Sequence, residues 1–295
     1  MAPDDAVARR TTPARASRTA QYMALYRALE TEVRDRAPLF RDPFAVRFLE
    51  RPLRRAVTLS RVGTLRRALE AYADFRAPGA RTSAIGRTRF IDDVLREDVA
   101  EGTRQVVVLG AGYDCRAHRL EELGACKVFE VDRAATQGDK QRRLGNSGRA
   151  DVVYVPIDFG VDELSDALDR ASFDRTRRTT FVWEGVTNYL DEGSVAKVLG
   201  FIGTCARGSR LVFTYVHRGV LDRSIHFPGS AKIMQNVARL GEPWTFGLRP
   251  EDAGSFVAQF GLTLERTSAR TTIAHSMGCG RTGMRFTASP WPVTV

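Results

Sequence analysis

One stretch of the chain, from Val106 to Asp132, constrains the fold more than any other. It reads VVVLGAGYDCRAHRLEELGACKVFEVD. An apolar run ends in the glycine turn Gly110-Ala111-Gly112, a helical segment follows, and a second apolar run ends in Asp132. A strand, a glycine turn, a helix and a strand with an acid at its tip place a nucleoside-bearing cofactor at the carboxyl end of a parallel sheet. The stretch therefore predicts an enzyme of the α/β class.

The residues of the turn indicate which cofactor it binds. Glycine lets a ligand lie against bare backbone, and Gly110 and Asp132 lie 22 positions apart, which suits a ribose-binding acid. The NAD-type fingerprint requires a third glycine where this chain has Cys115. Asp114 is an anion where a pyrophosphate would lie, and it disfavours a second anion there. The turn therefore favours a nucleoside without phosphates and with a cationic end, as in S-adenosylmethionine. A glycine turn that binds no ligand is the alternative.

The second half of the chain alternates between strand and helix patterns. We expect strands at 106–109, 128–131, 152–156, 180–184 and 211–215, and helices at 116–123, 134–144, 161–170 and 192–205. Further helices at 230–239 and 250–260 and two weaker strands at 262–267 and 284–288 complete this part. Because short helices join successive strands, we predict a doubly wound, mostly parallel, seven-stranded sheet.

The first hundred residues have helical patterns. We expect helices at 17–36, 43–49, 53–73 and 87–100, and a disordered basic tail at 1–16, which has few apolar residues. No flexible linker follows, so we predict one domain over 17–295. Within it, residues 17–103 form a helical cap, and residues 104–295 form a cofactor-binding sheet with acceptor-site insertions.

The composition excludes several other classes of protein. No stretch of about 18 apolar residues occurs, and the N-terminus lacks the apolar segment of a secretory signal, so we expect a cytoplasmic protein with no membrane partner. The net charge is +10. The arginines between Arg51 and Arg67 interleave with Leu53, Val57, Leu65 and Leu69, which is typical of the solvated face of helices rather than an RNA-binding stripe.

The cysteines and histidines show no metal-binding spacing. Cysteines occur at 115, 126, 205 and 279 without a CxxC pair, and histidines occur at 118, 217, 226 and 275. We therefore predict no metal site.

Several further motifs follow one another along the chain. They are TAxxxAxxRAxE (19–30), Asp42-Pro43, GRTRFIDD (86–93), the glycine turn, VFEVD (128–132), IDF (157–159), WEGVTNYL (183–190) and GEPWTFG (241–247). Over residues 17–265 the chain resembles the leucine carboxyl methyltransferase-like group of class I S-adenosylmethionine-dependent methyltransferases, which includes bacterial polyketide carboxyl O-methyltransferases. The resemblance implies a Rossmann-like fold, S-adenosylmethionine as cofactor and a small-molecule substrate. The chain has Ala134 where the family usually has proline, and residues 266–281 do not align.

The nucleoside end of the cofactor has several candidate ligands. Asp132 is our first candidate for the ribose hydroxyls, and Glu130, one pleat away on the same face, competes with it. By resemblance, Asp158 accepts a hydrogen bond from the adenine amino group and the backbone of Phe159 donates to the ring. The alternative for Asp158 is a helix N-cap.

The methionine end needs a cation for its carboxylate and an acid for its ammonium. By resemblance Arg87 is our first choice for the carboxylate and Arg27 the second, while Arg81 is a rival. Glu184, at the end of a predicted strand, suits the ammonium. Glu184 and Tyr189 are our two catalytic candidates. Tyr189 either lines the acceptor pocket or belongs to the core.

Arg116 and Arg119, on the helix after the turn, are expected to form structural ion pairs with Glu130 or Asp114.

These residues predict an O-methyltransferase that acts on a carboxylate of a small molecule. A carboxylate is already a nucleophile and needs positioning more than a base, whereas a hydroxyl or phenol acceptor, the near alternative, needs one. Three further classes stay open: an RNA-modifying or nucleic-acid-binding protein, a nicotinamide oxidoreductase, and a catalytically silent cofactor-binding member. The sequence leaves the acceptor and the oligomeric state undetermined.

Overall fold

A sheet forms the centre of the protein in the computed structural model, which describes residues 18–227, 229–239, 241–265, 267–268 and 293–294. Its strand order is β3-β2-β1-β4-β5-β9-β8. The five strands that pair in parallel are β1 (Gln105–Leu109), β2 (Lys127–Asp132), β3 (Val153–Pro156), β4 (Thr179–Trp183) and β5 (Arg210–Thr214). The expected α/β fold with a mostly parallel sheet is confirmed.

Two short strands extend the sheet beyond β5. β9 (Val293–Thr294) pairs antiparallel with β5, and β8 (Thr267–Ser268) pairs antiparallel with β9. Of the residues expected to form a strand at 262–267, the structure describes only Thr267 as part of a strand, and β8 begins there. The strand expected at 284–288 lies outside the described residues.

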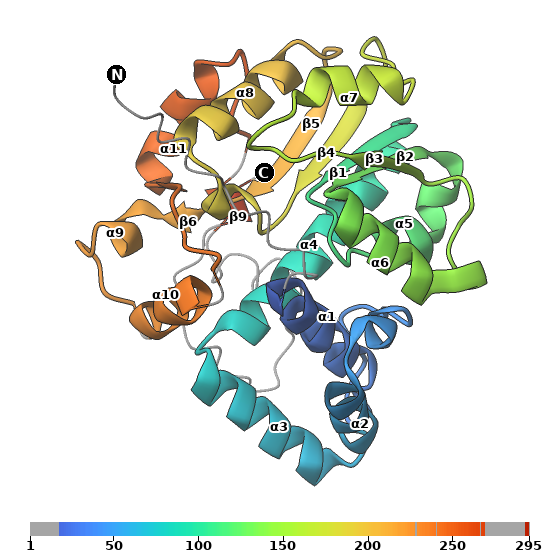
Figure 1. The fold of residues 1–295 in the computed structure, drawn as a ribbon, viewed down its shortest axis with the longest axis vertical. Coiled ribbons are helices and arrows are strands. Elements are labelled where there is room, and N and C mark those ends of the chain that lie inside the picture. Colours follow the sequence, from blue (N-terminus) through green and yellow to red (C-terminus); the bar gives the residue numbers. More distant parts are fainter. Residues whose placement is uncertain (1–17, 228, 240, 266, 269–292, 295) are drawn as a thin grey trace, which may run out of the picture.

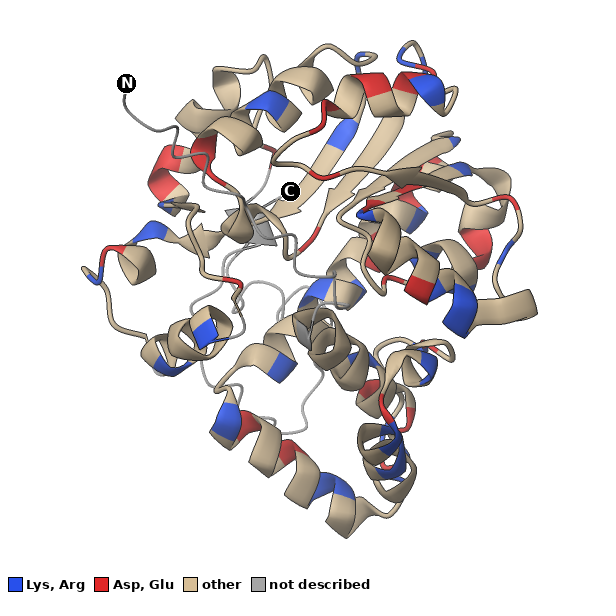
Figure 2. Cartoon of the chain, in the orientation of Figure 1, with Lys and Arg blue, Asp and Glu red and all other residues tan. Residues whose placement is uncertain are grey.

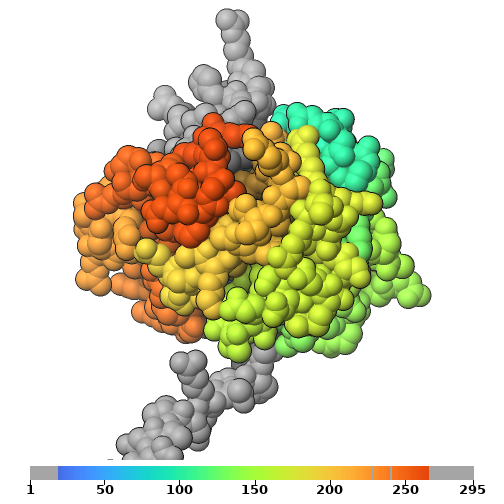
Figure 3. Space-filling model, turned by 90° about the horizontal axis from the view of Figure 1, so that it is seen from above, coloured from blue at the N-terminus to red at the C-terminus, as the bar shows by residue number. Residues whose placement is uncertain are grey.

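Helices cover both faces of the parallel strands, which is why β1 and β4 are buried along their whole length. Side chains of a strand alternate between faces, so Val107 and Leu109 belong to one apolar cluster and Val106 and Val108 to another. The first cluster includes residues of α7 (Leu164–Arg170), α8 (Glu192–Gly203) and α11 (Pro250–Ala258), and the second includes residues of α4 (Ala80–Ala100). Figure 3 shows the segments of α11, α8 and α7 side by side on one face of the molecule.

The N-terminal helices pack around the end of β1. α1 (Arg18–Thr31) and the 3₁₀ helix η1 (Ala45–Phe48) share a third apolar cluster with Tyr113 and Cys115, which follow the glycine turn. The rings of Phe48 and Tyr113 stack with their centroids 4.5 Å apart. α2 (Arg51–Leu59) and α3 (Gly63–Arg76) continue outward from η1, as Figure 1 shows.

The expectation of a single helix at 53–73 is wrong, because α2 and α3 are separate helices. The hydroxyl of Ser60 donates to the carbonyl of Val57 at 2.7 Å, and the chain turns before Gly63 begins α3. α4 begins at Ala80 rather than at 87, because Gly79 adopts a left-handed φ of 79° directly before it. The helix expected at 116–123 is a single turn, α5 (Arg116–Arg119), followed by the 3₁₀ helix η2 (Glu121–Ala125).

The remaining elements lie beside the carboxyl end of the sheet or join its strands. They are α6 (Ala134–Leu144), η3 (Gly145–Ser147), η4 (Thr187–Tyr189), β6 (Val216–His217), α9 (Arg218–Leu221), α10 (Ser230–Arg239) and β7 (Gly247–Leu248). β6 and β7 form a separate two-stranded sheet that the sequence patterns did not predict. Within the described ranges, no helix has the length and apolar character needed to cross a membrane.

Candidate active site

A cavity of about 420 Å³ lies where the chain order of the strands reverses, between β1 and β4. Ligands of open α/β sheets bind in this position, and the volume falls in the range of small-molecule sites. All the site residues that the sequence predicted line the cavity: Arg27, Arg87, Gly110, Ala111, Gly112, Asp132, Asp158, Phe159, Glu184 and Tyr189. The fold therefore brings together residues that lie up to 162 positions apart in the sequence.

The glycine turn has the conformation that its residues permit. Gly110 and Gly112 have φ values of 64° and 45°, which side-chain-bearing residues rarely adopt. A Cβ on Gly110 would also overlap the side chain of Val186. The amide of Gly112 donates to Asp132 Oδ2 at 2.6 Å, and the amide of Arg133 donates to Asp132 Oδ1 at 2.7 Å. Asp132 therefore holds the turn in place and also faces the cavity.

Glu130, the competing candidate for the ribose, belongs to the interior instead. Its side chain is 1% exposed and accepts a hydrogen bond from Lys140 Nζ at 2.5 Å. Burial raises the pKa of Glu130 to about 7, although Lys140 opposes the shift. His118 Nε2 lies 3.8 Å from Glu130 Oε1, and burial lowers the pKa of His118 to about 4. Of these two acids, Asp132 lines the cavity and Glu130 does not.

Asp158 and Phe159 lie at the edge of the cavity beyond β3. Asp158 is exposed, and its Oδ1 accepts a hydrogen bond from the amide of Gly160 at 3.1 Å. The N-cap alternative for Asp158 is wrong, because α7 begins at Leu164 and Glu163 occupies its N-cap position. The half-buried ring of Phe159 lies 6.2 Å from the ring of Trp183.

The other end of the cavity holds an ion pair between α4 and the end of β4. Arg87 Nε donates to Glu184 Oε1 at 2.9 Å, and Glu184 Oε2 lies 2.8 Å from Arg116 Nη1. The side chains of Arg87 and Glu184 are 16% and 18% exposed, respectively. Burial alone would raise the pKa of Glu184, but the two guanidinium groups outweigh it and lower this pKa. Glu184 is therefore ionised at neutral pH.

Arg27 ties α1 to the glycine turn. Its Nε donates to Asp42 Oδ2 at 2.8 Å and its Nη2 donates to the carbonyl of Tyr113 at 2.5 Å. Arg81, the rival candidate, lies away from the cavity and pairs with Asp74 at 2.7 Å. Arg27 and Arg87 line the cavity, whereas Arg81 does not.

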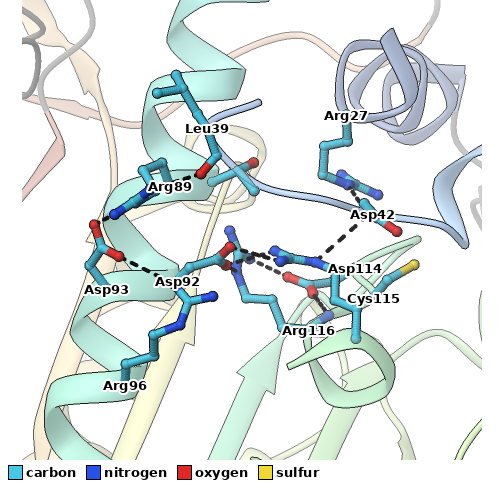
Figure 4. A network of polar contacts seen from close by, with 12 residues as sticks. Arg27, Leu39, Asp42, Arg89, Asp92, Asp93, Arg96, Asp114, Cys115 and Arg116 are labelled. Carbon is cyan, nitrogen blue, oxygen red and sulfur yellow. Dashed lines mark hydrogen bonds and ion pairs between the residues drawn. The ribbon is translucent and has the colours of Figure 1, made fainter. Parts of the chain in front are cut away.

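A network of ion pairs connects these groups, and Figure 4 shows the part of it around Asp42, Asp92 and Arg116. Asp92, which is fully buried, accepts hydrogen bonds from Arg116 Nε at 2.9 Å and from two nitrogens of Arg119 at 2.7 Å each. The charges balance, since the guanidinium groups of Arg27, Arg87, Arg116 and Arg119 face the carboxylates of Asp42, Asp92, Asp114 and Glu184.

The expected partners of the two helix arginines are partly correct. Arg116 pairs with Asp114, as predicted, but also with Asp92 and Glu184. Arg119 pairs with Asp92 rather than with Asp114 or Glu130. Burial alone would raise the pKa of Asp114, yet Arg116, Lys140 and Arg27 together hold it well below its usual value. Asp114 therefore keeps a negative charge at the turn.

α1 and the segment 241–245 line the cavity near Tyr189. The hydroxyl of Thr19 donates to Glu242 Oε2 at 2.6 Å, and the amide of Thr245 donates to the carbonyl of Asn188 at 2.8 Å. Burial raises the pKa of Tyr189, so its hydroxyl stays protonated at neutral pH. Glu242 and Met23 are cavity residues that sequence reasoning missed. For Glu242 the signal was available, since it is the acid of GEPWTFG.

None of the histidines that the structure describes lines the cavity. His118 is interior, and His217 Nδ1 accepts a hydrogen bond from the amide of Gly219 at 3.0 Å. His226 is exposed, and His275 lies outside the described residues. The part of the chain that the structure describes also contains no group of three or more metal-ligating side chains.

The chain is similar to known methyltransferases over most of its length. Residues 20–203 match the family described as leucine carboxyl methyltransferase. A protein of Frankia alni named "Putative S-adenosyl-L-methionine-dependent methyltransferase" is 39% identical over 218 residues, which cover 72% of this chain and 73% of that protein. A protein of the same name from Streptomyces avermitilis is 37% identical over 236 residues, 76% of this chain and 78% of its own length.

A solved structure supports the fold. The crystal structure titled as a putative methyltransferase from Thermobifida fusca superposes with a TM-score of 0.58 at 18% identity, and covers 92% of this chain and 93% of its own. Fold and cavity together define an α/β protein with a cavity at the switch point of its sheet, where proteins of this class bind their ligands. The chain belongs to the leucine carboxyl methyltransferase family, and it is a methyltransferase of the S-adenosylmethionine-dependent class.

Proposed function

We propose that this enzyme transfers a methyl group to an oxygen atom of a small molecule, with a carboxylate as acceptor and a methyl ester as product. The observation that carries the proposal is the cavity that joins the ribose-type acid Asp132 to the Arg87–Glu184 pair. Membership of a carboxyl methyltransferase family supports the carboxylate. The described histidines lie outside the cavity, and this also supports a carboxylate acceptor, because a carboxylate needs no base.

The chemistry of the cavity wall fits S-adenosylmethionine. Asp132 offers acceptors to a ribose diol, and Asp158 with Phe159 suits the adenine. Arg27 and Arg87 suit the methionine carboxylate, and Glu184 suits the ammonium. When bound, the cofactor supplies a methyl group on a positively charged sulfur atom.

The charge of the wall supports the same cofactor. The acids that line the cavity are Asp114, Asp132, Asp158, Glu184 and Glu242, against the arginines Arg27, Arg87 and Arg133. This wall is negative although the chain as a whole carries +10. A negative wall attracts a cationic cofactor and disfavours a phosphate-bearing dinucleotide.

We also propose that residues 17–103 act as a cap within a single domain over 17–295. α1 supplies Thr19, Ala20, Met23 and Arg27 to the cavity wall, and α4 supplies Arg87. The cap would exclude water from the site and position the acceptor.

Replacing Asp132 by alanine is expected to weaken binding of S-adenosylhomocysteine about 5–150-fold, which corresponds to about 1–3 kcal/mol for polar partners left without a hydrogen bond. Isothermal titration calorimetry measures the change, and circular dichroism checks the fold, because Asp132 also holds the amide of Gly112. Asp151→Ala, at an acid whose side chain is 63% exposed and outside the cavity, serves as control. Unchanged affinity in a folded Asp132→Ala variant would contradict the ribose assignment.

A hydroxyl acceptor is a second candidate, and Glu242 is the observation that favours it. The carboxylate of Glu242 lines the cavity near Tyr189 and accepts a hydrogen bond from Thr19. A carboxylate in this position can take the proton of a hydroxyl or phenol during methyl transfer. The same carboxylate would repel the negative charge of a carboxylate acceptor. A hydroxyl acceptor therefore requires Glu242 as a base, whereas a carboxylate acceptor does not.

A panel of carboxylic acids and phenols, assayed with the wild type and with Glu242→Gln, distinguishes the two acceptors. For a carboxylate we expect kcat of the variant to stay within a few-fold of the wild type. For a hydroxyl we expect a loss of about 10²–10⁴-fold in kcat, the contribution of a general base. Glu251→Gln, an exposed acid on α11, is the matched control. Intact cofactor binding without turnover of either class would contradict both proposals.

A further inference from the structure

Helix α3 buries a charged residue and exposes large apolar ones, which is the reverse of the usual arrangement. Its buried residue is Arg66, whose side chain is 6% exposed and pairs with Asp35 and with Glu70. Three of its large apolar residues lie in solvent instead, with exposed fractions of 43% for Leu65, 63% for Tyr72 and 71% for Phe75. A surface helix normally buries its apolar stripe and exposes its charges.

The exposed apolar residues lie on one face. At about 100° per residue, Leu65, Tyr72 and Phe75 fall within roughly 80° of one another around the axis of α3. Leu59 and Val62, each 55% exposed, precede α3 in the chain. We call these five residues, with α2 and α3, the α2–α3 surface. Apolar side chains gathered in this way mark an interaction site.

The α2–α3 surface lies at the edge of the molecule. α3 forms the outermost edge of the protein in Figure 1, on the side opposite α7 and α8. At this outer edge the surface is accessible to a flat partner.

The exposed charges of this surface are mostly positive. In residues 51–76 the exposed cations are Arg51, Arg54, Arg55, Arg61, Arg67 and Arg76, of which Arg61 pairs with Glu32. The acids of α3, Glu70 and Asp74, pair with Arg66 and Arg81. Figure 2 shows where the basic and acidic residues of α2 and α3 lie along the ribbon. Lys232 of α10 adds a further cation, since its Nζ lies 4.3 Å from the ring centroid of Phe75. A second copy of this chain would set like charges against each other, so the charge favours an anionic partner.

We propose that the α2–α3 surface binds the face of an anionic lipid membrane. Tyr72 and Phe75 enter the interface between headgroups and acyl chains, and the surrounding arginines contact the acidic headgroups. This binding is peripheral, and it differs from the expectation from the sequence that the protein has no membrane partner. It is independent of which acceptor is methylated, because the surface contributes no residue to the cavity.

Co-sedimentation of the full chain with phosphatidylcholine vesicles, with and without phosphatidylglycerol, tests the proposal. We expect binding only to the vesicles that contain phosphatidylglycerol, and loss of that binding at high salt. The Tyr72→Ser/Phe75→Ser variant keeps every charge and should bind about tenfold more weakly or worse, because apolar burial contributes to such binding. Arg67→Gln/Arg76→Gln should also bind more weakly. Val161→Ser, at an apolar residue that is 78% exposed outside this surface, should bind as the wild type does.

Three outcomes would overturn the proposal. The first is an absence of binding to vesicles that contain phosphatidylglycerol. The second is binding that Tyr72→Ser/Phe75→Ser leaves unchanged, which would show attraction by net charge alone. The third is a concentration-dependent dimer that the same variant abolishes without any vesicle binding, which would assign the surface to a second copy. Circular dichroism of each variant confirms that the fold is retained.

Discussion

Asp92→Ala is expected to lower the free energy of unfolding by about 3–5 kcal/mol, the usual cost of removing one partner of a buried ion pair. The carboxylate of Asp92 is fully buried and accepts three hydrogen bonds from Arg116 and Arg119. Both arginine side chains are only 3% exposed, so bulk water does not readily replace the lost acceptor. Urea denaturation followed by circular dichroism measures the change.

The neighbouring residue provides the matched control. Asp93 lies next in the sequence on the same helix and also pairs with two arginines, Arg89 and Arg96, but all three side chains are 38% exposed. Ion pairs in solvent contribute about 0–1 kcal/mol, so Asp93→Ala should change stability by less than about 1 kcal/mol. Equal effects of the two substitutions would contradict the structural role of the buried network.

Arg87→Ala is expected to weaken cofactor binding about 10–150-fold. We assign Arg87 to the methionine carboxylate, and hydrogen bonds to charged groups contribute about 1.5–3 kcal/mol each. The substitution also removes one of the two guanidinium groups that hold Glu184. Titration calorimetry with S-adenosylhomocysteine measures the loss, and titration with adenosine, which lacks the amino-acid end, should show little change.

Arg96→Ala is the control for Arg87→Ala, since Arg96 lies on the same helix, is 38% exposed and is outside the cavity. An equal loss of affinity for adenosine and for S-adenosylhomocysteine in Arg87→Ala would indicate that the residue supports the fold of the site rather than the amino-acid end of the ligand.

Local patterns were sufficient for the parallel strands and for the nucleoside end of the site. The strand–glycine–strand unit places Asp132 beside the glycine turn because the residues involved are close in sequence and the geometry of the unit is regular. The break between α2 and α3 was missed, because residues 53–73 keep a helical apolar pattern through Ser60. Resemblance to a family, rather than local pattern, selected Arg87 and Arg27 from 45 basic residues.

By itself the sequence determined the α/β class, the glycine turn and the acid that faces the cavity beside it, since these depend on backbone conformation and on residues within one unit. Only the tertiary structure decided that Glu130 pairs with Lys140, that Asp92 holds both Arg116 and Arg119, and that Glu242 reaches Thr19 across 223 positions. It also decided that α3 faces solvent with its apolar side. Partners of charged side chains depend on which elements the topology brings together and on how deeply they are buried, and neither quantity is encoded in a local pattern.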